Sequence, residues 1–219
     1  MYTLVIGNKN YSSWSMRAWL ALREAGIAFN EIRIPLFAPG SHERILRYSP
    51  AARVPVLLAA DTTIWDSLAI CETVAELHPE KRLWPQDAAA RCHARAICAE
   101  MHSGFQALRS GMPMNIRAVL PGKGRSAEVD RDIERITQMW LACRERFGAG
   151  GDMLFGHFTI ADAFYAPVVM RFMTYAVDLP PVASRYAKAV RALPSVGEWV
   201  AAAREETEVI ADAEPYSGA

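Results

Sequence analysis

The pattern of apolar residues changes near residue 87, and this change constrains the fold more than any other feature of the sequence. Before it, short β-rich runs alternate with amphipathic segments that end at glycine, proline or charged residues. The expected order is strand, helix, strand, helix, a two-stranded hairpin and a final helix. The segments cover residues 2–7, 15–26, 29–34, 41–49, 54–61, 62–66 and 67–78. This order predicts a compact mixed sheet covered by helices.

The sequence after Asp87 is predominantly helical and contains a loop rich in glycine and proline at residues 112–126. The expected helices cover residues 88–111, 127–148, 158–177, 181–194 and 195–206. The stretch before them carries two prolines and several charges, as linkers do. We therefore predict an α/β domain over residues 1–79, a linker over 80–87 and an all-helical domain over 88–219.

Charge and cysteine content exclude several classes of function. Lysine plus arginine balances aspartate plus glutamate, 24 against 24, which disfavours a nucleic-acid binder. The apolar runs are too short and interrupted to span a membrane, and no secretory signal pattern is evident at the N-terminus. The four cysteines form neither a C-x-x-C pair nor a metal-binding spacing with histidine, so we expect no metal site and a reducing, cytoplasmic environment.

The stretch YSSWSMRAW, residues 11–19, places three serines at the start of a predicted helix. We predict that Ser15 is the N-cap, with Trp14 and Trp19 packed together as a hydrophobic staple. Ser12 and Ser13 would then face a helix N-terminus, which favours anions. There they could donate to the thiol of a ligand and lower its pKa. A serine-rich turn without chemistry is the alternative.

Two further motifs are compatible with a peptide-like ligand. Val54-Pro55 opens a predicted strand, and a cis bond there would turn the Val54 backbone outward, although an ordinary trans proline is the commoner arrangement. Asp66 and Ser67 precede another helix, whose first-turn amides could bind a carboxylate while Asp66 pairs with an ammonium group. A plain N-cap is the alternative at this second helix.

The stretch HFTIADAFYAP has a different character. Thr159 and Asp162 have the spacing of a capping box at the start of a strongly apolar helix. Here the structural interpretation is the main one. The box would fix the start of a buried helix and contribute about 1 kcal/mol.

Taken together, these motifs resemble those of cytosolic glutathione transferases, over nearly the whole chain. SSWSMRAWLAL is similar to the SSxSxRVRIAL stretch of the zeta class, which includes maleylacetoacetate isomerases, and SPAARVPVL is similar to its NPxxxVPxL stretch. Trp14 stands where that class has a cysteine, and Trp19 where it has an arginine. The resemblance implies a thioredoxin-like first domain, an all-helical second domain, glutathione as co-substrate and a homodimer.

The resemblance also implies roles for individual residues. Ser12 would donate to the glutathione thiolate, helped by Ser13, and Val54 would pair with the cysteinyl backbone. Asp66 and Ser67 would hold the γ-glutamyl end. His42 or Arg53 is in position to reach the glycine carboxylate, while Pro55 would shape the strand start.

We expect the second substrate between the two domains, against a wall of adaptable apolar side chains with arginines for an acidic group. The expected wall residues are Phe105, Arg109, Met112, Met114 and Arg117; an ordinary solvated position is the alternative for either arginine. The first functional expectation is transfer of glutathione to a small electrophile. The alternatives are isomerisation of the maleylacetoacetate type and a non-catalytic glutathione-binding module. A thiol-disulfide enzyme would need a cysteine where Ser12 or Trp14 stands.

Overall fold

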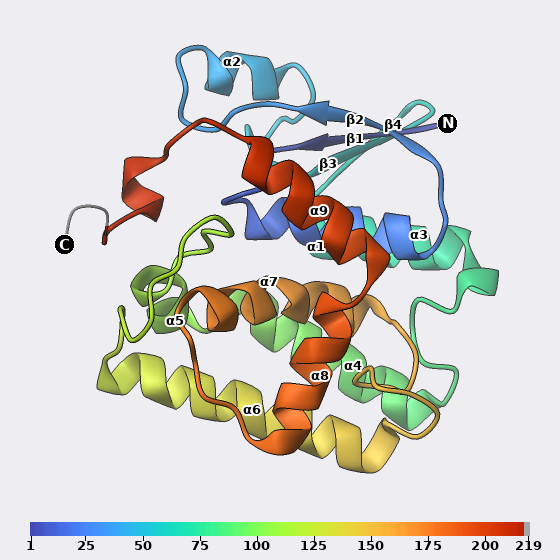
Figure 1. The fold of residues 1–219 in the computed structure, drawn as a ribbon. Helices are drawn as coiled ribbons and strands as arrows, with labels where there is room; N and C mark the ends of the chain where they lie inside the picture. Colours follow the sequence, from blue (N-terminus) through green and yellow to red (C-terminus); the bar gives the residue numbers. More distant parts are fainter. Residues whose placement is uncertain (217–219) are drawn as a thin grey trace.

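The computed structural model describes residues 1–216, and its first part is a four-stranded mixed sheet (Figure 1). The strand order is β2-β1-β3-β4, with β1 parallel to β2 and the other neighbours antiparallel. The strands are β1 (Tyr2–Ile6), β2 (Phe29–Arg33), β3 (Val56–Ala59) and β4 (Thr62–Trp65). The last two form the predicted hairpin, in which Leu58 pairs with Thr63.

Helices cover both faces of this sheet. Helices α1 (Ser13–Glu24) and α3 (Ser67–Leu77) lie on one face, and the short α2 (Ser41–Leu46) lies on the other (Figure 1). Because side chains alternate along a strand, Leu4 belongs to the large core beneath the sheet, whereas its neighbour Val5 belongs to a small core near α2. The predicted order of strands and helices is confirmed.

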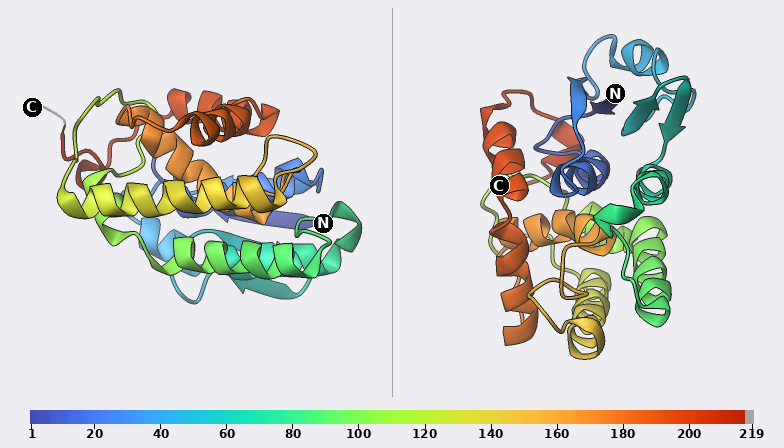
Figure 2. Two further views of the ribbon diagram at one scale, coloured as in Figure 1. Left: turned by 90° about the horizontal axis from the view of Figure 1, so that it is seen from below. Right: turned by 90° about the vertical axis from the view of Figure 1, so that its right-hand side faces the viewer.

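The second part of the chain is all-helical and stacks against the first (Figure 2). Its helices are α4 (Ala88–Ser103), α5 (Gln106–Gly111), α6 (Ala127–Phe147), α7 (Ile160–Thr174), α8 (Pro181–Arg191) and α9 (Pro194–Glu205). Helix α7 is buried over nearly its whole length and packs on both α1 and α4. It therefore joins the two parts through one continuous apolar core.

One predicted helix is divided in the structure. The single helix expected over residues 88–111 is wrong, because the chain breaks after Ser103 into α4 and α5. Gly104 is extended, and Phe105 has a positive φ of 60°, so the helix cannot continue through them. The domain limits at residues 79 and 87 stay predictions. They agree with a short 3₁₀ turn, η1 (Pro79–Lys81), which lies between α3 and α4.

The capping box at the start of α7 is confirmed. The Thr159 N–H donates to Asp162 Oδ2 at 2.8 Å, and the Leu154 N–H donates to Asp162 Oδ1 at 3.1 Å. Burial raises the pKa of Asp162 to about 6, although these donors oppose the shift. The carboxylate thus joins α7 to the loop before it.

Three of the four cysteines are buried. Cys71, Cys98 and Cys143 are buried, and burial raises the pKa of Cys71 and Cys143 to about 12, so these thiols stay protonated. Cys92 is exposed. Within residues 1–216 no group of histidine, cysteine and acidic side chains is placed to hold a metal ion. No helix in the same range is long and apolar enough to cross a membrane.

Candidate active site

A cavity of about 820 Å³ opens at one end of the sheet, between the segments that follow β1, β2 and β4 and the one that precedes β3, and most of the residues expected to bind glutathione line it. The starts of α1 and α3 both face it, and α4 contributes a histidine from the helical part. The expected glutathione-binding residues that line it are Ser12, His42, Arg53, Val54, Asp66 and Ser67, and the structural Pro55 lines it too. Ser13 is the expected site residue that is not among its lining residues. The fold therefore brings together segments 55 residues apart in sequence, from Ser12 to Ser67.

The first helix begins earlier than predicted. The N-cap is Ser12, whose Oγ accepts from the Ser15 N–H at 3.3 Å, so the assignment of Ser15 as N-cap is wrong. Trp14 then lies inside the first turn and Trp19 in the body of the helix, which also overturns the proposed staple. Trp19 is buried and donates to Glu31 instead. Each of the three serines is a suitable N-cap by residue type, so the sequence cannot identify the first residue of the helix. The conformation of the β1–α1 loop determines that Ser12 is the cap.

Ser15 nevertheless has a structural function of its own. Its Oγ accepts from the Gly7 N–H at 3.1 Å and lies 2.8 Å from Ser12 Oγ. Both hydroxyls are buried, and each can donate or accept. The two serines therefore form a short hydroxyl chain that runs from the end of β1 to the cavity.

Two buried arginine side chains lie near this helix start. Arg171 donates to Ser13 Oγ at 3.4 Å and to the Met112 carbonyl at 2.9 Å. Arg17 is sandwiched between Trp14 and Phe164, with its guanidinium carbon 4.4 and 4.6 Å from the ring centroids. Burial lowers the pKa of Arg17 and of Arg171 to about 9, so both stay cationic at neutral pH. They place positive charge in the low-dielectric region behind α1.

The Val54-Pro55 bond is cis in the structure, the rarer of the two arrangements considered above. Val54 and Pro55 line the cavity together with Arg53 and His42. This wall is formed by the segment that leads into β3 and by α2. Sequence alone could not choose between cis and trans, because the dipeptide is the same in both.

The start of α3 differs from that of α1. Asp66 is its N-cap, with Oδ1 accepting from the Leu68 N–H at 2.8 Å, as the plain-cap alternative expects. Ser67 is buried, yet its Oγ has no hydrogen-bond partner in the part of the chain that the structure describes. A buried, unpaired hydroxyl at the edge of a cavity is available to a ligand. The plain-cap alternative thus holds for Asp66, and the carboxylate-binding role of Ser67 stays a prediction.

His102 is a cavity residue that the sequence analysis missed. Its Nε2 lies 3.3 Å from Asp66 Oδ2, and its ring meets Trp14 edge to face at 5.1 Å between centroids. Burial lowers the pKa of His102, opposed by Asp66 and reinforced by Arg17 and Arg109. No sequence signal identifies this histidine, because it lies in the last turn of an otherwise unremarkable helix and reaches the cavity only through the packing of α4.

The residues expected to receive a second substrate are mostly engaged elsewhere. Phe105, Met112 and Met114 are buried, and Arg109 donates to the Gly104 carbonyl and lies over Trp14 at 4.9 Å. Arg117 donates to the Tyr11 hydroxyl and to the Glu208 carbonyl, both at 2.8 Å. Among the described residues, none of these five lines the main cavity. Their contact with a second substrate stays a prediction.

Comparisons with known proteins agree with this geometry. Residues 11–77 match the family model of the glutathione S-transferase N-terminal domain, and residues 126–202 match that of the C-terminal domain. Maleylacetoacetate isomerase from Rattus norvegicus is 31% identical over 174 residues, 77% of each chain. A probable maleylacetoacetate isomerase from Caenorhabditis elegans is 29% identical over 77% of this chain and 78% of the relative. A solved glutathione transferase homologue from Burkholderia, with bound glutathione, superposes with a TM-score of 0.71 at 25% identity, covering 94% of this chain and 99% of its own.

Proposed function

Because the chain belongs to the glutathione S-transferase family, we propose that it uses the Ser12 hydroxyl to activate glutathione for attack on a small electrophile. The protein is a glutathione-dependent transferase or isomerase. One observation carries the role of Ser12: its hydroxyl lies at the N-terminus of α1 and lines the cavity. A thiolate placed there receives a hydroxyl donor and the positive end of a helix.

The hydroxyl chain supports this role for Ser12. In the absence of a thiolate, Ser12 donates to Ser15 Oγ at 2.8 Å. When Ser12 turns its proton to a sulfur, Ser15 can donate to Ser12 Oγ across the same distance. Ser15 Oγ still accepts from the Gly7 N–H at 3.1 Å. The exchange therefore leaves no hydroxyl unpaired and strengthens Ser12 as a donor.

The remaining glutathione contacts follow from the cavity wall. We propose that Val54 pairs with the cysteinyl backbone, that Ser67 donates to the γ-glutamyl carboxylate and that Asp66 binds the amino group; all three residues line the cavity. His42 and Arg53 are candidates for the glycine carboxylate. Charge-assisted bonds of this kind are stronger than neutral ones. A homodimer in the cytoplasm, with no metal, belongs to the same proposal, and sedimentation analysis tests the dimer.

The deciding experiment compares Ser12→Ala with Ser13→Ala. We expect Ser12→Ala to lower kcat/KM for an activated aryl halide by about 10- to 100-fold, since a hydrogen bond to a charged group contributes about 1.5–3 kcal/mol. Glutathione affinity should change much less. Ser13 does not line the cavity and its hydroxyl is engaged by Arg171, so its variant should keep a larger share of the activity. Equal activity of Ser12→Ala and wild type would refute the proposal.

A second candidate reaction is cis–trans isomerisation of a maleyl-type diacid, favoured by the identity to the rat isomerase. Both reactions begin with the same thiolate, and they differ in whether glutathione leaves the product. An assay panel that includes such a diacid distinguishes them. Tight binding of glutathione without turnover on any member of the panel would instead support a non-catalytic binding module.

A further inference from the structure

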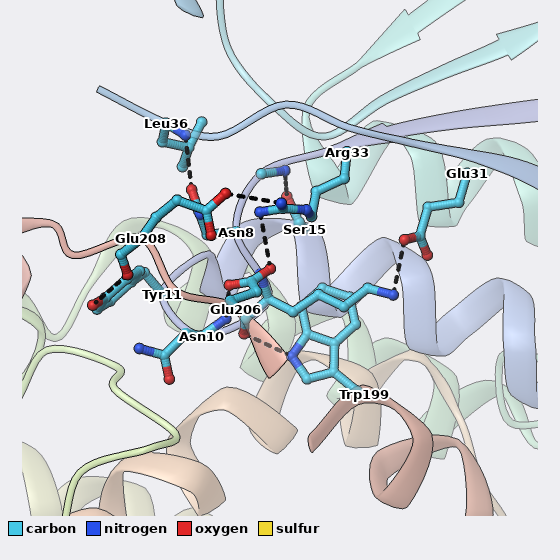
Figure 3. A network of polar contacts seen from close by, with 12 residues as sticks. Asn8, Asn10, Tyr11, Ser15, Glu31, Arg33, Leu36, Trp199, Glu206 and Glu208 are labelled. Carbon is cyan, nitrogen blue, oxygen red and sulfur yellow. Dashed lines mark hydrogen bonds and ion pairs between the residues drawn. The ribbon is translucent and has the colours of Figure 1, made fainter. Parts of the chain in front are cut away.

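The loop that carries Ser12 is held from outside by the C-terminal segment Glu206–Tyr216, here called the C-terminal strap. The strap leaves the end of α9 beside the sheet and turns back along the helical part (Figure 1). Its first residue meets the β1–α1 loop almost 200 positions earlier in the chain, as the bonds between Glu206 and residues 9 and 10 show. Residues from the two ends of the sequence thus share one polar network (Figure 3).

Glu206 is the central contact of this network. Its Oε1 accepts from the Lys9 N–H at 2.7 Å, and its Oε2 accepts from the Asn10 N–H at 3.0 Å. The residue is 7% exposed, and Arg33 lies 3.4 Å from Oε1. A carboxylate is the side chain suited to this position, because it presents two acceptors to two adjacent backbone donors.

The rest of the loop is fixed by neighbouring segments. Trp199 Nε1, in α9, donates to the Lys9 carbonyl at 2.9 Å. The Asn10 side chain donates to Asn115 Oδ1 and accepts from the Arg117 N–H, both at 2.9 Å. The Tyr11 hydroxyl contacts two residues of the strap, the Glu208 carbonyl and the Glu214 carboxylate. Each of residues 9, 10 and 11 is therefore bonded to residues that follow position 114.

This constraint is transmitted directly to the helix start. The Asn8 carbonyl accepts from the Tyr11 N–H at 3.2 Å and from the Ser12 N–H at 2.8 Å. The turn that places Ser12 therefore encloses Lys9, Asn10 and Tyr11, the residues that the strap holds. We infer that the C-terminal strap, through the Glu206 carboxylate, positions the Ser12 hydroxyl for the glutathione thiolate; the inference rests on the proposed function. Glu206 is thus a positioning residue, acting through the backbone of Lys9 and Asn10.

The test compares Glu206→Gln with Glu205→Gln in the full chain. Glutamine has one acceptor oxygen where two N–H groups need one each, so a backbone donor loses its partner. We expect Glu206→Gln to raise the pKa of the bound glutathione thiol. This pKa is measured from the absorbance of the thiolate as a function of pH. At pH values below that pKa, the fraction of bound glutathione present as thiolate should fall about three- to tenfold, since each unit of pKa changes this fraction tenfold. Hydrogen exchange of the Lys9 and Asn10 amides should also accelerate. The neighbouring, exposed Glu205 should show neither change.

Each outcome decides the inference. An unchanged thiol pKa in folded Glu206→Gln overturns it, even if the variant is less stable. Should that variant not fold, Tyr11→Phe replaces it, since it keeps the ring and removes only the phenol's bonds, which join it to the strap and to Arg117; an unchanged thiol pKa there overturns the inference too. Ser12→Ala is measured in parallel. A thiol pKa in Ser12→Ala equal to that of wild type would refute the proposed function. A thiol pKa that rises in Ser12→Ala but not in Glu206→Gln would refute only the role of the strap.

Discussion

Two helix N-termini face the same cavity, and they are built in opposite ways. At the start of α1, Ser12, Ser13 and Ser15 all have hydrogen-bond partners, and the preceding loop is held by the C-terminal strap. At the start of α3, Ser67 is buried without a partner in the described chain, and the Asp66 side chain is 45% exposed. One start is fixed in advance, and the other has unused hydrogen-bonding capacity.

The difference matches two different tasks. A donor that lowers a thiol pKa must hold its position to a fraction of an ångström, and a network of satisfied bonds provides that. A subsite that captures a carboxylate needs donors that are not already committed. Variants at α1 should therefore alter the reactivity of the bound thiol, whereas variants at α3 should alter affinity.

The largest effect within this comparison is expected at Ser67. Ser67→Ala removes a donor to a carboxylate, so the affinity for glutathione should fall about 10- to 100-fold, as titration calorimetry would show. The pKa of the bound thiol should not move. Ser49→Ala is the matched control, because Ser49 is likewise buried without a partner for its Oγ in the described residues but does not line the cavity. A thiol pKa shifted in Ser67→Ala would remove the distinction between the two starts.

A third helix start serves as a structural reference. At α7 the two oxygens of the Asp162 carboxylate accept from the Leu154 and Thr159 N–H groups. Asparagine has one acceptor oxygen, so Asp162→Asn leaves one of these donors unpaired. We expect the free energy of unfolding in urea to fall by about 1–3 kcal/mol, measured at a pH about two units above the Asp162 pKa of about 6. The exposed Asp152→Asn should change little. Glutathione affinity and thiol pKa should stay as in wild type; a change in either would connect α7 to the site.

A smaller effect is expected at Ser15. Ser15→Ala removes the second hydroxyl of the chain and leaves the Gly7 N–H without its acceptor. The pKa of the bound thiol should rise, and conjugation below that pKa should slow about three- to tenfold, with glutathione affinity almost unchanged. Ser195→Ala is the control, because Ser195 is also buried but its Oγ has no partner among the described residues. Loss of affinity with an unaltered thiol pKa would show that Ser15 serves only the fold.

The sequence predicted most of the fold because its signals are local. Strand alternation, the hairpin and the α7 capping box each depend on residues within a few positions of one another. The break between α4 and α5 was missed, since Gly104 alone does not end a helix; the positive φ of Phe105 completes the break. The α1 cap was misassigned for the opposite reason, an excess of equivalent local signals.

The candidate site was predictable where motifs carry it and not elsewhere. Ser12, Val54, Asp66 and Ser67 each lie at the start of a strand or helix, where the sequence marks a boundary. His102 and Glu206 lie instead at the C-terminal ends of α4 and α9. His102 reaches the site through the packing of α4 and contacts Asp66, 36 positions earlier in the chain. Glu206 acts on the site through the strap and contacts Lys9, nearly 200 positions earlier. Long-range geometry of this kind has no local signal.

The smallest effect concerns His102, which connects the α3 start to α4. Its pKa lies below the usual value of about 6.5, so at neutral pH the ring is uncharged and leaves the Asp66 charge available to an ammonium group. The groups facing it are Asp66, Arg17 and Arg109, with Trp14 and Phe164 against the ring. As the pH falls through the folded pKa, the imidazolium pairs with Asp66 and competes with the ligand's amino group.

We therefore expect the affinity for S-methylglutathione, which has no thiol to titrate, to weaken below the folded pKa of His102. The change should be about two- to fivefold, the range of a partly exposed ion pair. His102→Gln should flatten this dependence. The free energy of unfolding should also decrease as the pH drops. Between the folded pKa of His102 and about 6.5 the unfolded chain binds the proton more strongly, so wild-type stability falls as the pH drops through that window. Burial also lowers the pKa of His93, so His93→Gln should reduce the stability slope yet keep the affinity slope. A pH-independent affinity in wild type would show that His102 does not govern the Asp66 subsite.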